Sequence, residues 1–303
     1  MNRTDYYLKE LEGINEVPTL PHIAFKLIAL ISDDNSSMRA IGDLIEDDPP
    51  LVAKILRIVN SGFYNIRNEV KSVRQAVVLL GLEELKNLVF AMSVFSTFYH
   101  IKENEYFNFI QFWKHSASTS KVAAVLAKYL GFDFKHISFV GGLLHDFGRL
   151  VLQLYFQEDY QEVFEYALEN KIGLYQAEKE SMGFSHDEAG YWLAQKWHLP
   201  DELSTIMRYH HRITENDVEN EPLLAIIHAA DRITNIWGVG IEPLPVMAPL
   251  EENPIWIKML NVYPKLQKFP LMEMTRVFDM HLEEAEMFVN QISRLHEIAD
   301  GEK

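Results

Sequence analysis

The sequence predicts an all-α protein, and three observations support that prediction. Apolar residues recur at helical spacing along most of the chain, no stretch alternates strictly between apolar and polar residues, and no turn dipeptide separates two β-branched runs. A chain of 303 residues with 48% apolar residues is long enough for two domains with separate cores. We therefore expect two helical subdomains, over residues 14–105 and 106–303.

Apolar stripes in the N-terminal subdomain predict helices over residues 23–31, 51–59, 72–80 and 83–98. The second of these helices follows Asp48-Pro49-Pro50, because proline suits a first helical turn, and it ends near Asn60. Gly81 is the expected end of the third helix. The short polar segment over residues 100–106 is the expected boundary between the subdomains.

The C-terminal subdomain is expected to be helical as well. A loop over residues 238–254 contains four prolines and interrupts the helical pattern. A last helix is predicted over residues 272–299, acidic on one face and apolar on the other, and we expect it to pack on the C-terminal subdomain.

Charge and composition exclude several classes of protein. The 28 Lys and Arg residues against 44 Asp and Glu residues give a net charge of −16, which argues against a surface that binds nucleic acid. The absence of cysteine excludes disulfides, thiolate zinc sites, Fe–S clusters and cysteine nucleophiles. The first residues are too polar for a signal peptide, and no uncharged apolar run reaches the ~18 residues of a membrane span. We therefore expect a cytoplasmic protein that does not contact the membrane.

The segment over residues 139–152 is apolar except at His145, Asp146 and Arg149. A carboxylate in so apolar a stretch costs several kcal/mol unless it is paired or bound to a metal ion. A buried His–Asp hydrogen bond, or an ion pair between Asp146 and Arg149, accounts for the pattern as well as a metal site does. The three glycines of this segment each weaken a helix by up to ~1 kcal/mol, so we expect a backbone or a ligand to approach closely there.

Two further histidines have simple structural interpretations. His115 lies in the middle of an apolar helix, where a hydrogen-bonded core histidine is common. His186 follows Ser185, and the order Ser185-His186-Asp187-Glu188 is typical of a capping box at a helix start. A residue in that first turn also lies at a helix end, which is a common place for a ligand.

The last candidate positions are His210, His211 and Asp231. Neighbouring helical residues diverge by about 100°, so both histidines reach one site only if the helix ends there. The alternative is one buried and one exposed imidazole near a helix C-terminus. Asp231 interrupts an apolar helix. His228 lies on the same helix face and is either a rival ligand or a partner that supports Asp231. Arg232 could instead neutralise the charge of Asp231.

In chain order, these positions follow the pattern H…HD…H…HH…D, which resembles the two-metal arrangement of the HD superfamily of metal-dependent phosphohydrolases. The N-terminal half resembles the HDOD branch, the HD-related output domain. The segments that carry the HDOD resemblance are Leu20-Pro21-His22-Ile23, residues 47–61, 72–81 and 145–152, and Trp197-His198-Leu199-Pro200.

The resemblance implies an HD-type helical bundle in the C-terminal subdomain, with Asp146 as a catalytic carboxylate that bridges two metal ions. It implies that one ion is held by His115, His145 and Asp231, and the other by His186, His210 and His211. One or two transition-metal ions are therefore expected, with Fe or Mn favoured and Zn or Ni as alternatives, because imidazoles with few carboxylates suit these ions better than Ca or Mg. Two such ions can hold a hydroxide for attack on phosphorus.

The residues around the expected site differ from those of some HD enzymes. Arg149 stands where many of them have lysine and could still bind a phosphate. Members of the HD-GYP branch, which cleave cyclic dinucleotides, have a loop with glycine and proline after the paired histidines, whereas residues 212–217 contain neither. Some members also carry a glutamate one turn before the first histidine, where this chain has Gln111. Cyclic-di-GMP hydrolysis is therefore disfavoured.

Three functions remain open from the sequence. The first is a regulatory signalling protein that binds metal, a nucleotide or other phosphate ligand, and a signalling protein partner. The second is an active metal-dependent phosphohydrolase or phosphodiesterase, and the third is a metal-free helical interaction scaffold. Seven candidate ligands in the right order argue against the scaffold, and the altered loop after His211 favours the regulatory protein over the enzyme.

Overall fold

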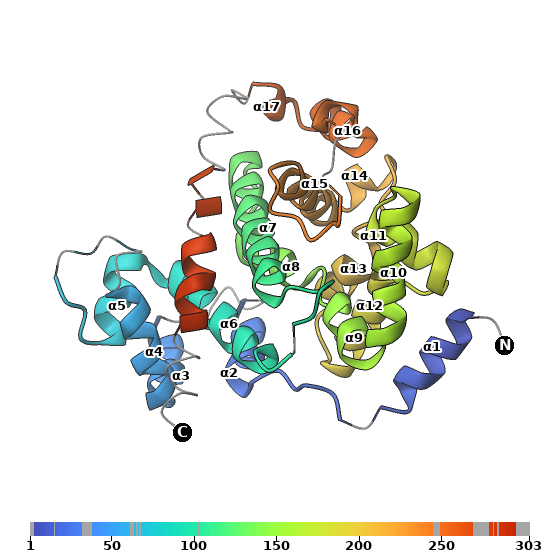
Figure 1. The fold of residues 1–303 in the computed structure, drawn as a ribbon. Coiled ribbons are helices and arrows are strands. Elements are labelled where there is room, and N and C mark those ends of the chain that lie inside the picture. The colour runs from blue at the N-terminus through green and yellow to red at the C-terminus, as the bar shows by residue number, and fades with distance from the viewer. Residues whose placement is uncertain are drawn as a thin grey trace. The chain divides into compact units, whose positions relative to one another are not determined.

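The computed structural model shows an all-helical chain (Figure 1), which confirms the predicted fold class. It describes residues 3–14, 16–31, 38–60, 64, 66, 68–101, 103–244, 249–268, 279–280, 282–283 and 285–294. All regular secondary structure in these residues is helical. None of the helices in this described part is both long and apolar enough to cross a membrane.

The chain divides into two compact units, and each is described by itself. The large unit contains residues 1–17 and 101–282, and the small unit contains residues 18–100 and 283–303. Of the helix predicted over residues 272–299, the helical residues 285–294 group with the small unit rather than with the C-terminal half of the chain. The helix α1 (Arg3–Glu12) groups with the large unit.

In its described part, the small unit contains the four helices that the apolar stripes predict, together with α3 and the helical residues 285–294. Its elements are α2 (His22–Ile31), α3 (Met38–Glu46), α4 (Pro49–Val59), α5 (Val73–Leu80) and α6 (Leu82–Phe98). Asp48 caps α4 by accepting a hydrogen bond from the Leu51 amide at 3.0 Å, just ahead of the proline pair. Gly81 ends α5 with a φ of 84°, a backbone conformation that other residues rarely adopt.

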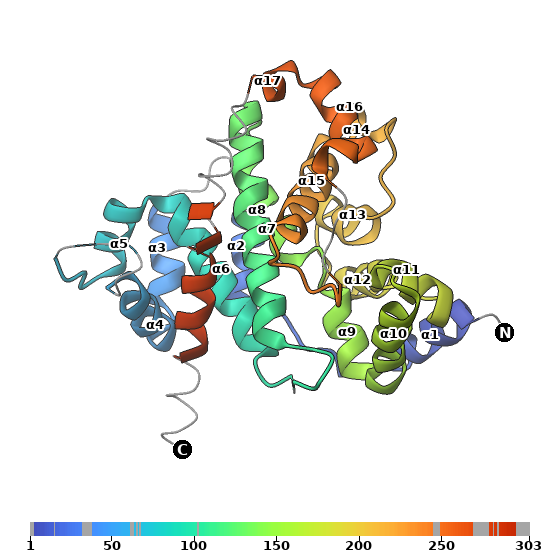
Figure 2. The same ribbon diagram turned by 45° about the horizontal axis from the view of Figure 1, so that its top comes forward.

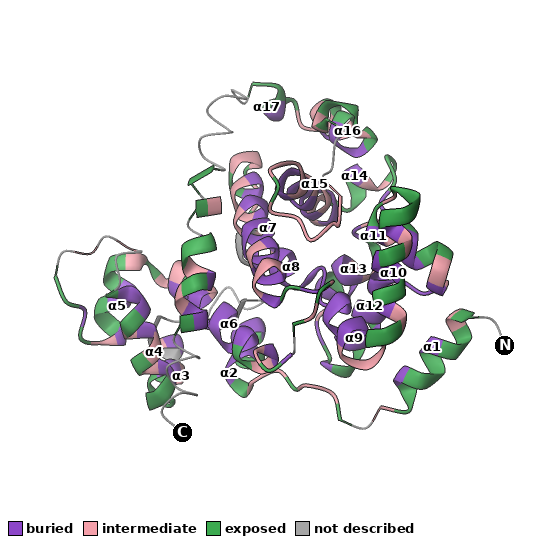
Figure 3. Cartoon of the chain, viewed as in Figure 1, coloured by how far each residue is buried: buried purple, intermediate pink, exposed green. Residues whose placement is uncertain are grey.

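The large unit contains the remaining helices, which position the candidate site. They are α7 (Phe109–Leu130), α8 (Lys135–Leu144), α9 (Gly148–Tyr155), α10 (Gln157–Asn170), α11 (Leu174–Ala177), the π-helical turn η2 (Glu178–Met182), α12 (His186–Lys196), α13 (Asp201–Tyr209), α14 (Asp217–Asn220), α15 (Pro222–Ile236), the 3-10 turn η3 (Leu250–Glu252), α16 (Pro254–Val262) and α17 (Pro264–Gln267). The long helix α7 packs against α8 and α15, and α12 packs against α9 and α13 (Figure 2). The surfaces that these helices share are buried (Figure 3).

Two glycines let the helices of the large unit approach to backbone contact. A Cβ atom at Gly148 would overlap the carbonyl oxygen of His186 and the amide of Gly190. A Cβ atom at Gly142 would lie 2.6 Å from the Cα atom of Ser120. The close approach that the sequence analysis expected at this segment therefore brings α9 against α12 and α8 against α7.

We expect Gly148→Ala to destabilise the large unit by about 3 kcal/mol, because neither contacting backbone can move away from an added methyl group. Gly173→Ala is the matched control, since the nearest atom to its added Cβ is a Glu242 carboxylate oxygen at an ordinary 3.5 Å. Urea unfolding followed by tryptophan fluorescence measures both variants, because all five tryptophans lie in the large unit. Equal stability of the two variants would contradict this account of the contact.

Candidate metal centre

The seven residues predicted as metal ligands come together in one cluster inside the large unit, and all of them except the half-buried His211 are buried. They come from five separate parts of the chain. His115 lies on α7, His145 and Asp146 on the turn between α8 and α9, His186 at the start of α12, His210 and His211 on the turn after α13, and Asp231 on α15. Residues more than one hundred positions apart thus share one site.

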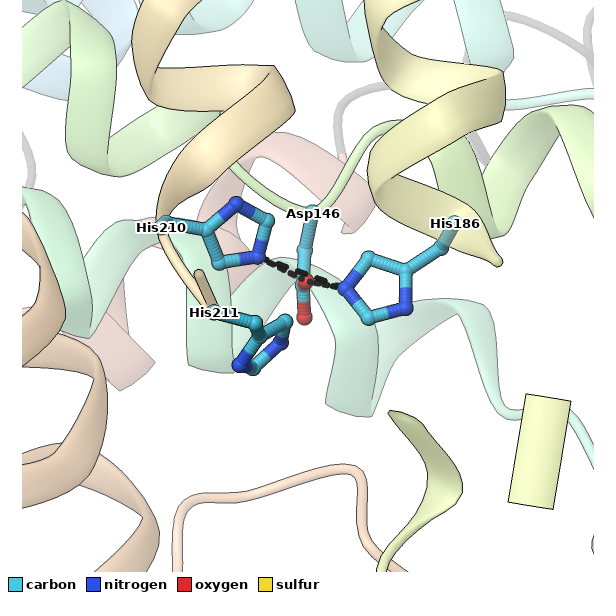
Figure 4. A group of neighbouring side chains, drawn as sticks. All are labelled: Asp146, His186, His210 and His211. Atoms are coloured by element: carbon cyan, nitrogen blue, oxygen red, sulfur yellow. Dashed lines mark hydrogen bonds and ion pairs between the residues drawn. The ribbon is translucent and has the colours of Figure 1, made fainter. Parts of the chain in front are cut away.

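Asp146 lies at the centre of the cluster (Figure 4). Its Oδ1 atom is 3.0 Å from Nε2 of His186 and 3.4 Å from Nε2 of His210. Its Oδ2 atom is 3.7 Å from Nε2 of both His115 and His145. The two oxygens of one carboxylate therefore face two different pairs of imidazoles.

The cluster consists of two groups that share Asp146. In the first group, ligand atoms of Asp146, His186, His210 and His211 all lie within 4.8 Å of one another. In the second group, the same holds for His115, His145 and Asp146. Asp231 flanks the second group, with Oδ1 3.1 Å from Nε2 of His115 and 3.6 Å from Nε2 of His145.

Four of the imidazoles are oriented by a hydrogen bond at Nδ1. The Nδ1 atom of His115 lies 3.2 Å from the carbonyl oxygen of Val239, and that of His145 lies 2.8 Å from the carbonyl oxygen of Gly142. The Nδ1 atom of His210 lies 3.0 Å from the carbonyl oxygen of Ile206, and that of His186 lies 2.6 Å from Oε2 of Glu178. Carbonyl and carboxylate oxygens only accept hydrogen bonds, so Nδ1 carries the hydrogen in each ring. The lone pair of a neutral ring is then at Nε2, which points into the cluster, as in histidines that bind metal ions.

Acceptor atoms therefore face one another at the centre of the cluster. Among the described residues, Nε2 of His115, His145 and His211 and Oδ1 of Asp146 meet no hydrogen-bond donor of suitable geometry. Buried acceptors without a donor cost free energy, and a proton or a cation between them removes that cost. Imidazole nitrogens and carboxylate oxygens form a donor set that fits a transition-metal ion.

Protons satisfy only part of this cluster. Burial lowers the pKa of His210, and burial together with His210 and His186 holds the pKa of His211 well below its usual range. Burial also lowers the pKa of His186, but the carboxylates of Glu178 and Asp146 outweigh burial and the Arg149 charge and raise it to about 9. His210 and His211 are thus neutral at pH 7, and their lone pairs are available to a cation.

Glu178 is a buried member of the site that the sequence analysis did not identify. Its Oε2 atom accepts from the backbone amide of His186 at 2.8 Å and from Nδ1 of that residue, and its Oε1 atom accepts from Arg149 and Tyr160 at 3.1 and 3.2 Å. Its side chain is completely buried in η2, whereas Glu180, two residues later, is exposed. Both glutamates flank Lys179, so the local sequence does not distinguish them.

The end of α13 at Tyr209 allows His210 and His211 to lie on the same side. Their ring centroids are 4.2 Å apart, and Tyr175 stacks on His211 at 4.5 Å. Arg212 donates to the Tyr175 hydroxyl at 3.3 Å. The helix end that the sequence analysis required for both histidines to reach one site is therefore present.

His228 supports the site without joining it. Its Nδ1 atom lies 2.8 Å from the carbonyl oxygen of His210, and Asn253 lies 3.3 Å from its Nε2 atom. Of the two roles considered for His228, the structure favours the supporting one. Gln111 has a similar role, because it donates to the carbonyl oxygen of Gly240 at 3.1 Å and so holds the loop that contains the acceptor of His115.

Arg149, which was predicted to bind a phosphate, is surrounded by carboxylates. It donates from Nε to Asp146 at 3.0 Å and from Nη1 to Glu178 at 3.1 Å, and its Nη2 atom is 3.7 Å from Glu242. The ion pair with Asp146 and the histidine cluster, which the sequence offered as alternatives, therefore exist together. Phosphate binding by Arg149 stays a prediction.

Comparisons with known proteins agree with this fold and site. The profile of the HDOD domain matches residues 17–213. An uncharacterised protein of Treponema pallidum (strain Nichols) is 27% identical over 222 residues, which are 73% of this chain and 42% of that protein. The chain thus spans less than half the length of this relative.

Solved structures show the same fold. An HDOD domain protein of unknown function from Geobacter sulfurreducens has a TM-score of 0.81 at 26% identity, over 96% of this chain and 98% of that chain. A candidate signal-transduction protein from Marinobacter aquaeolei VT8 has a TM-score of 0.74 at 21% identity, over 94% of this chain and 65% of that chain.

The fold and the site define an all-helical protein with a buried histidine–aspartate cluster of the kind that could hold metal ions. The profile match covers about two thirds of its length, and the chain belongs to the HDOD family.

We expect the metal-free protein to lose stability as the pH rises from 6.5 to 9. The pKa of His186 is about 9 in the folded state and 6.5 in the unfolded state. The contribution of His186 to the free energy of unfolding is therefore complete below pH 6.5 and is lost as the pH rises through 9. The shift corresponds to about 3 kcal/mol. Urea unfolding in EDTA across this pH range should show a shallower decline for His186→Gln than for wild type. The exposed His198→Gln should behave like wild type, and an identical decline in all three proteins would contradict the prediction.

Proposed function

We propose that the protein is a regulatory HDOD protein that binds two transition-metal ions at the cluster and, through them, a phosphate-bearing ligand. The observation that supports this proposal is the convergence of the imidazole Nε2 atoms on the carboxylate of Asp146, with acceptors facing acceptors. A cation on each side of Asp146 would satisfy all of these atoms.

We assign the ligands according to the two groups in the cluster. His115, His145 and Asp231 would hold one ion, His186, His210 and His211 the other, and Asp146 both. Bound ions of this kind supply positive charge that polarises phosphate oxygens and lowers the pKa of water. Iron or manganese is favoured, with zinc or nickel as alternatives, because the donor set combines imidazoles with two carboxylates.

The remaining residues hold these ligands in place. Glu178 fixes the ring of His186, as carboxylates commonly do for histidines that bind metal ions. Arg149 balances the charge of Asp146 and Glu178 at hydrogen-bond distance, so we assign it to positioning Asp146 rather than to gripping the phosphate directly.

A ligand would reach the cluster from the side of His211. This residue is half-buried, whereas the other six are buried. Arg212 follows it in the chain, pairs with Asp187 at 2.6 Å and has a side chain that is 29% exposed. Its Nη2 atom also lies 3.4 Å from Glu188, and the exposed part of the guanidinium can donate to a phosphate group on this side.

A regulatory role also implies a signalling protein partner. Support for this part comes from the HDOD family and from the similarity in fold to the Marinobacter protein, whose description is signal transduction.

Phosphodiester hydrolysis is the second candidate function. It is favoured by the shared carboxylate, because two ions that share a ligand can hold the attacking and the leaving oxygen of an in-line displacement. Against it stands the turn after His211, in which Asp217 accepts hydrogen bonds from Thr214 and no glycine or proline is present.

We expect wild-type protein purified with manganese or iron to contain about two metal ions per chain, because the two groups of ligand atoms are already held in place by the fold. Asp146→Ala should lose both ions, because it belongs to both groups. His115→Ala and His211→Ala should each lose about one ion. Elemental analysis measures this, with His198→Ala as the control and circular dichroism as the check on folding. Unchanged metal content in folded Asp146→Ala would refute the site.

The regulatory proposal predicts no hydrolysis of bis(p-nitrophenyl) phosphate by the metal-loaded protein beyond the rate with free metal ion. Release of p-nitrophenolate, followed by absorbance, tests this. Turnover in wild type that disappears in Asp146→Ala would reject the regulatory proposal in favour of the enzyme.

A further inference from the structure

A cavity of about 270 Å³ lies beside the metal centre in the large unit. Its walls combine the aromatic rings of Tyr106, Phe107 and Phe164 with the polar side chains of Arg149, Gln111 and Glu242. None of the seven cluster residues lines it, so a molecule in this cavity would not touch the proposed metal ions. Arg149 is the residue that contacts both the cavity and the cluster.

Arg149 offers an unused donor to this cavity. Its Nε and Nη1 atoms already donate to Asp146, Tyr160 and Glu178. Its Nη2 atom has no hydrogen bond among the described residues and forms only the 3.7 Å ion pair with Glu242. A ligand that supplies an acceptor would give this charged N–H group a hydrogen bond.

Glu242 offers an acceptor next to that donor. Its Oε2 atom accepts from the backbone amide of Leu174 at 2.7 Å. Its Oε1 atom is 3.7 Å from Nη2 of Arg149, which is too far for a hydrogen bond between them. The cavity therefore presents a donor and an acceptor side by side.

The charges around the cavity disfavour an anion. Arg149 already lies beside the carboxylates of Asp146, Glu178 and Glu242, and Glu105 also lines the cavity. Asp146 and Glu178 also face His186, whereas at the cavity wall Arg149 is the one cation against the carboxylates of Glu242 and Glu105. This negative surplus at the wall disfavours a phosphate or a carboxylate. The aromatic walls favour a planar ring.

We propose that this cavity binds a small uncharged aromatic molecule with an amide edge, that is, a carbonyl group next to an N–H group. The carbonyl oxygen accepts from Nη2 of Arg149, and the N–H group donates to Oε1 of Glu242. Tyr106, Phe107 and Phe164 cover the ring. A cavity of 270 Å³ is near the lower limit of small-molecule sites, which fits one or two rings. Because Arg149 also holds Asp146, this site is placed to influence the metal centre.

Nicotinamide and nicotinate form a matched pair of probes, equal in size, in which only the amide is uncharged. We expect saturation-transfer NMR on the full chain to show nicotinamide binding in the millimolar range, as is usual for so small a ligand, and nicotinate binding at least about 10-fold more weakly. Equal binding of the two probes would overturn the proposal. So would the absence of nicotinamide binding at about 20 mM.

Two variants locate the binding. Leu168 lines the cavity and is 44% exposed, so Leu168→Trp should block nicotinamide binding without disturbing the core. Met287 is equally exposed and does not line the cavity, so Met287→Trp should bind nicotinamide like wild type. Glu242→Gln removes one negative charge and should reduce the preference for nicotinamide over nicotinate. Binding that survives in Leu168→Trp, or a preference unchanged in Glu242→Gln, would overturn the proposal.

Discussion

The burial of one carboxylate, that of Asp146, is the constraint on which the rest of this structure depends. The residue is 2% exposed, and a buried carboxylate costs several kcal/mol unless charged or hydrogen-bonding partners surround it. Arg149, His145 and His186 supply those partners and hold the pKa of Asp146 well below its usual range, although burial acts in the opposite direction. The helices of the large unit are arranged so that these partners converge.

That convergence depends on close backbone contacts and on buried supports. Gly148 brings α9 against the start of α12, where His186 lies. Glu178 then fixes His186 and Arg149 at once, and the carbonyl oxygens of α8 and α13 orient His145 and His210. The candidate ligands are therefore held in position by the protein itself, which reduces the cost of organising a metal site. The same Arg149 also reaches the neighbouring cavity, so one side chain links the two sites.

The sequence predicted much of the fold and of the cluster, because both leave periodic or contrasting patterns. Apolar stripes mark α2, α4, α5 and α6, and protic residues within apolar helices mark His115, His145, Asp146 and Asp231. The residues that hold the candidate ligands in position could not be predicted from the sequence. Glu178 resembles Glu180 in its local sequence and differs only in what the fold places beside it. The carboxylates around Arg149 come from residues up to 93 positions away, so its surroundings depend on tertiary structure.

The most direct test of the central claim is a crystal structure of the manganese- or iron-loaded protein, with anomalous diffraction collected at the metal absorption edge. The account predicts two anomalous peaks, one on each side of the Asp146 carboxylate, each about 2.0–2.3 Å from the Nε2 atoms of its own group of histidines. A well-ordered cluster without anomalous peaks, in which the imidazoles contact only one another, Asp146 and water, would contradict it.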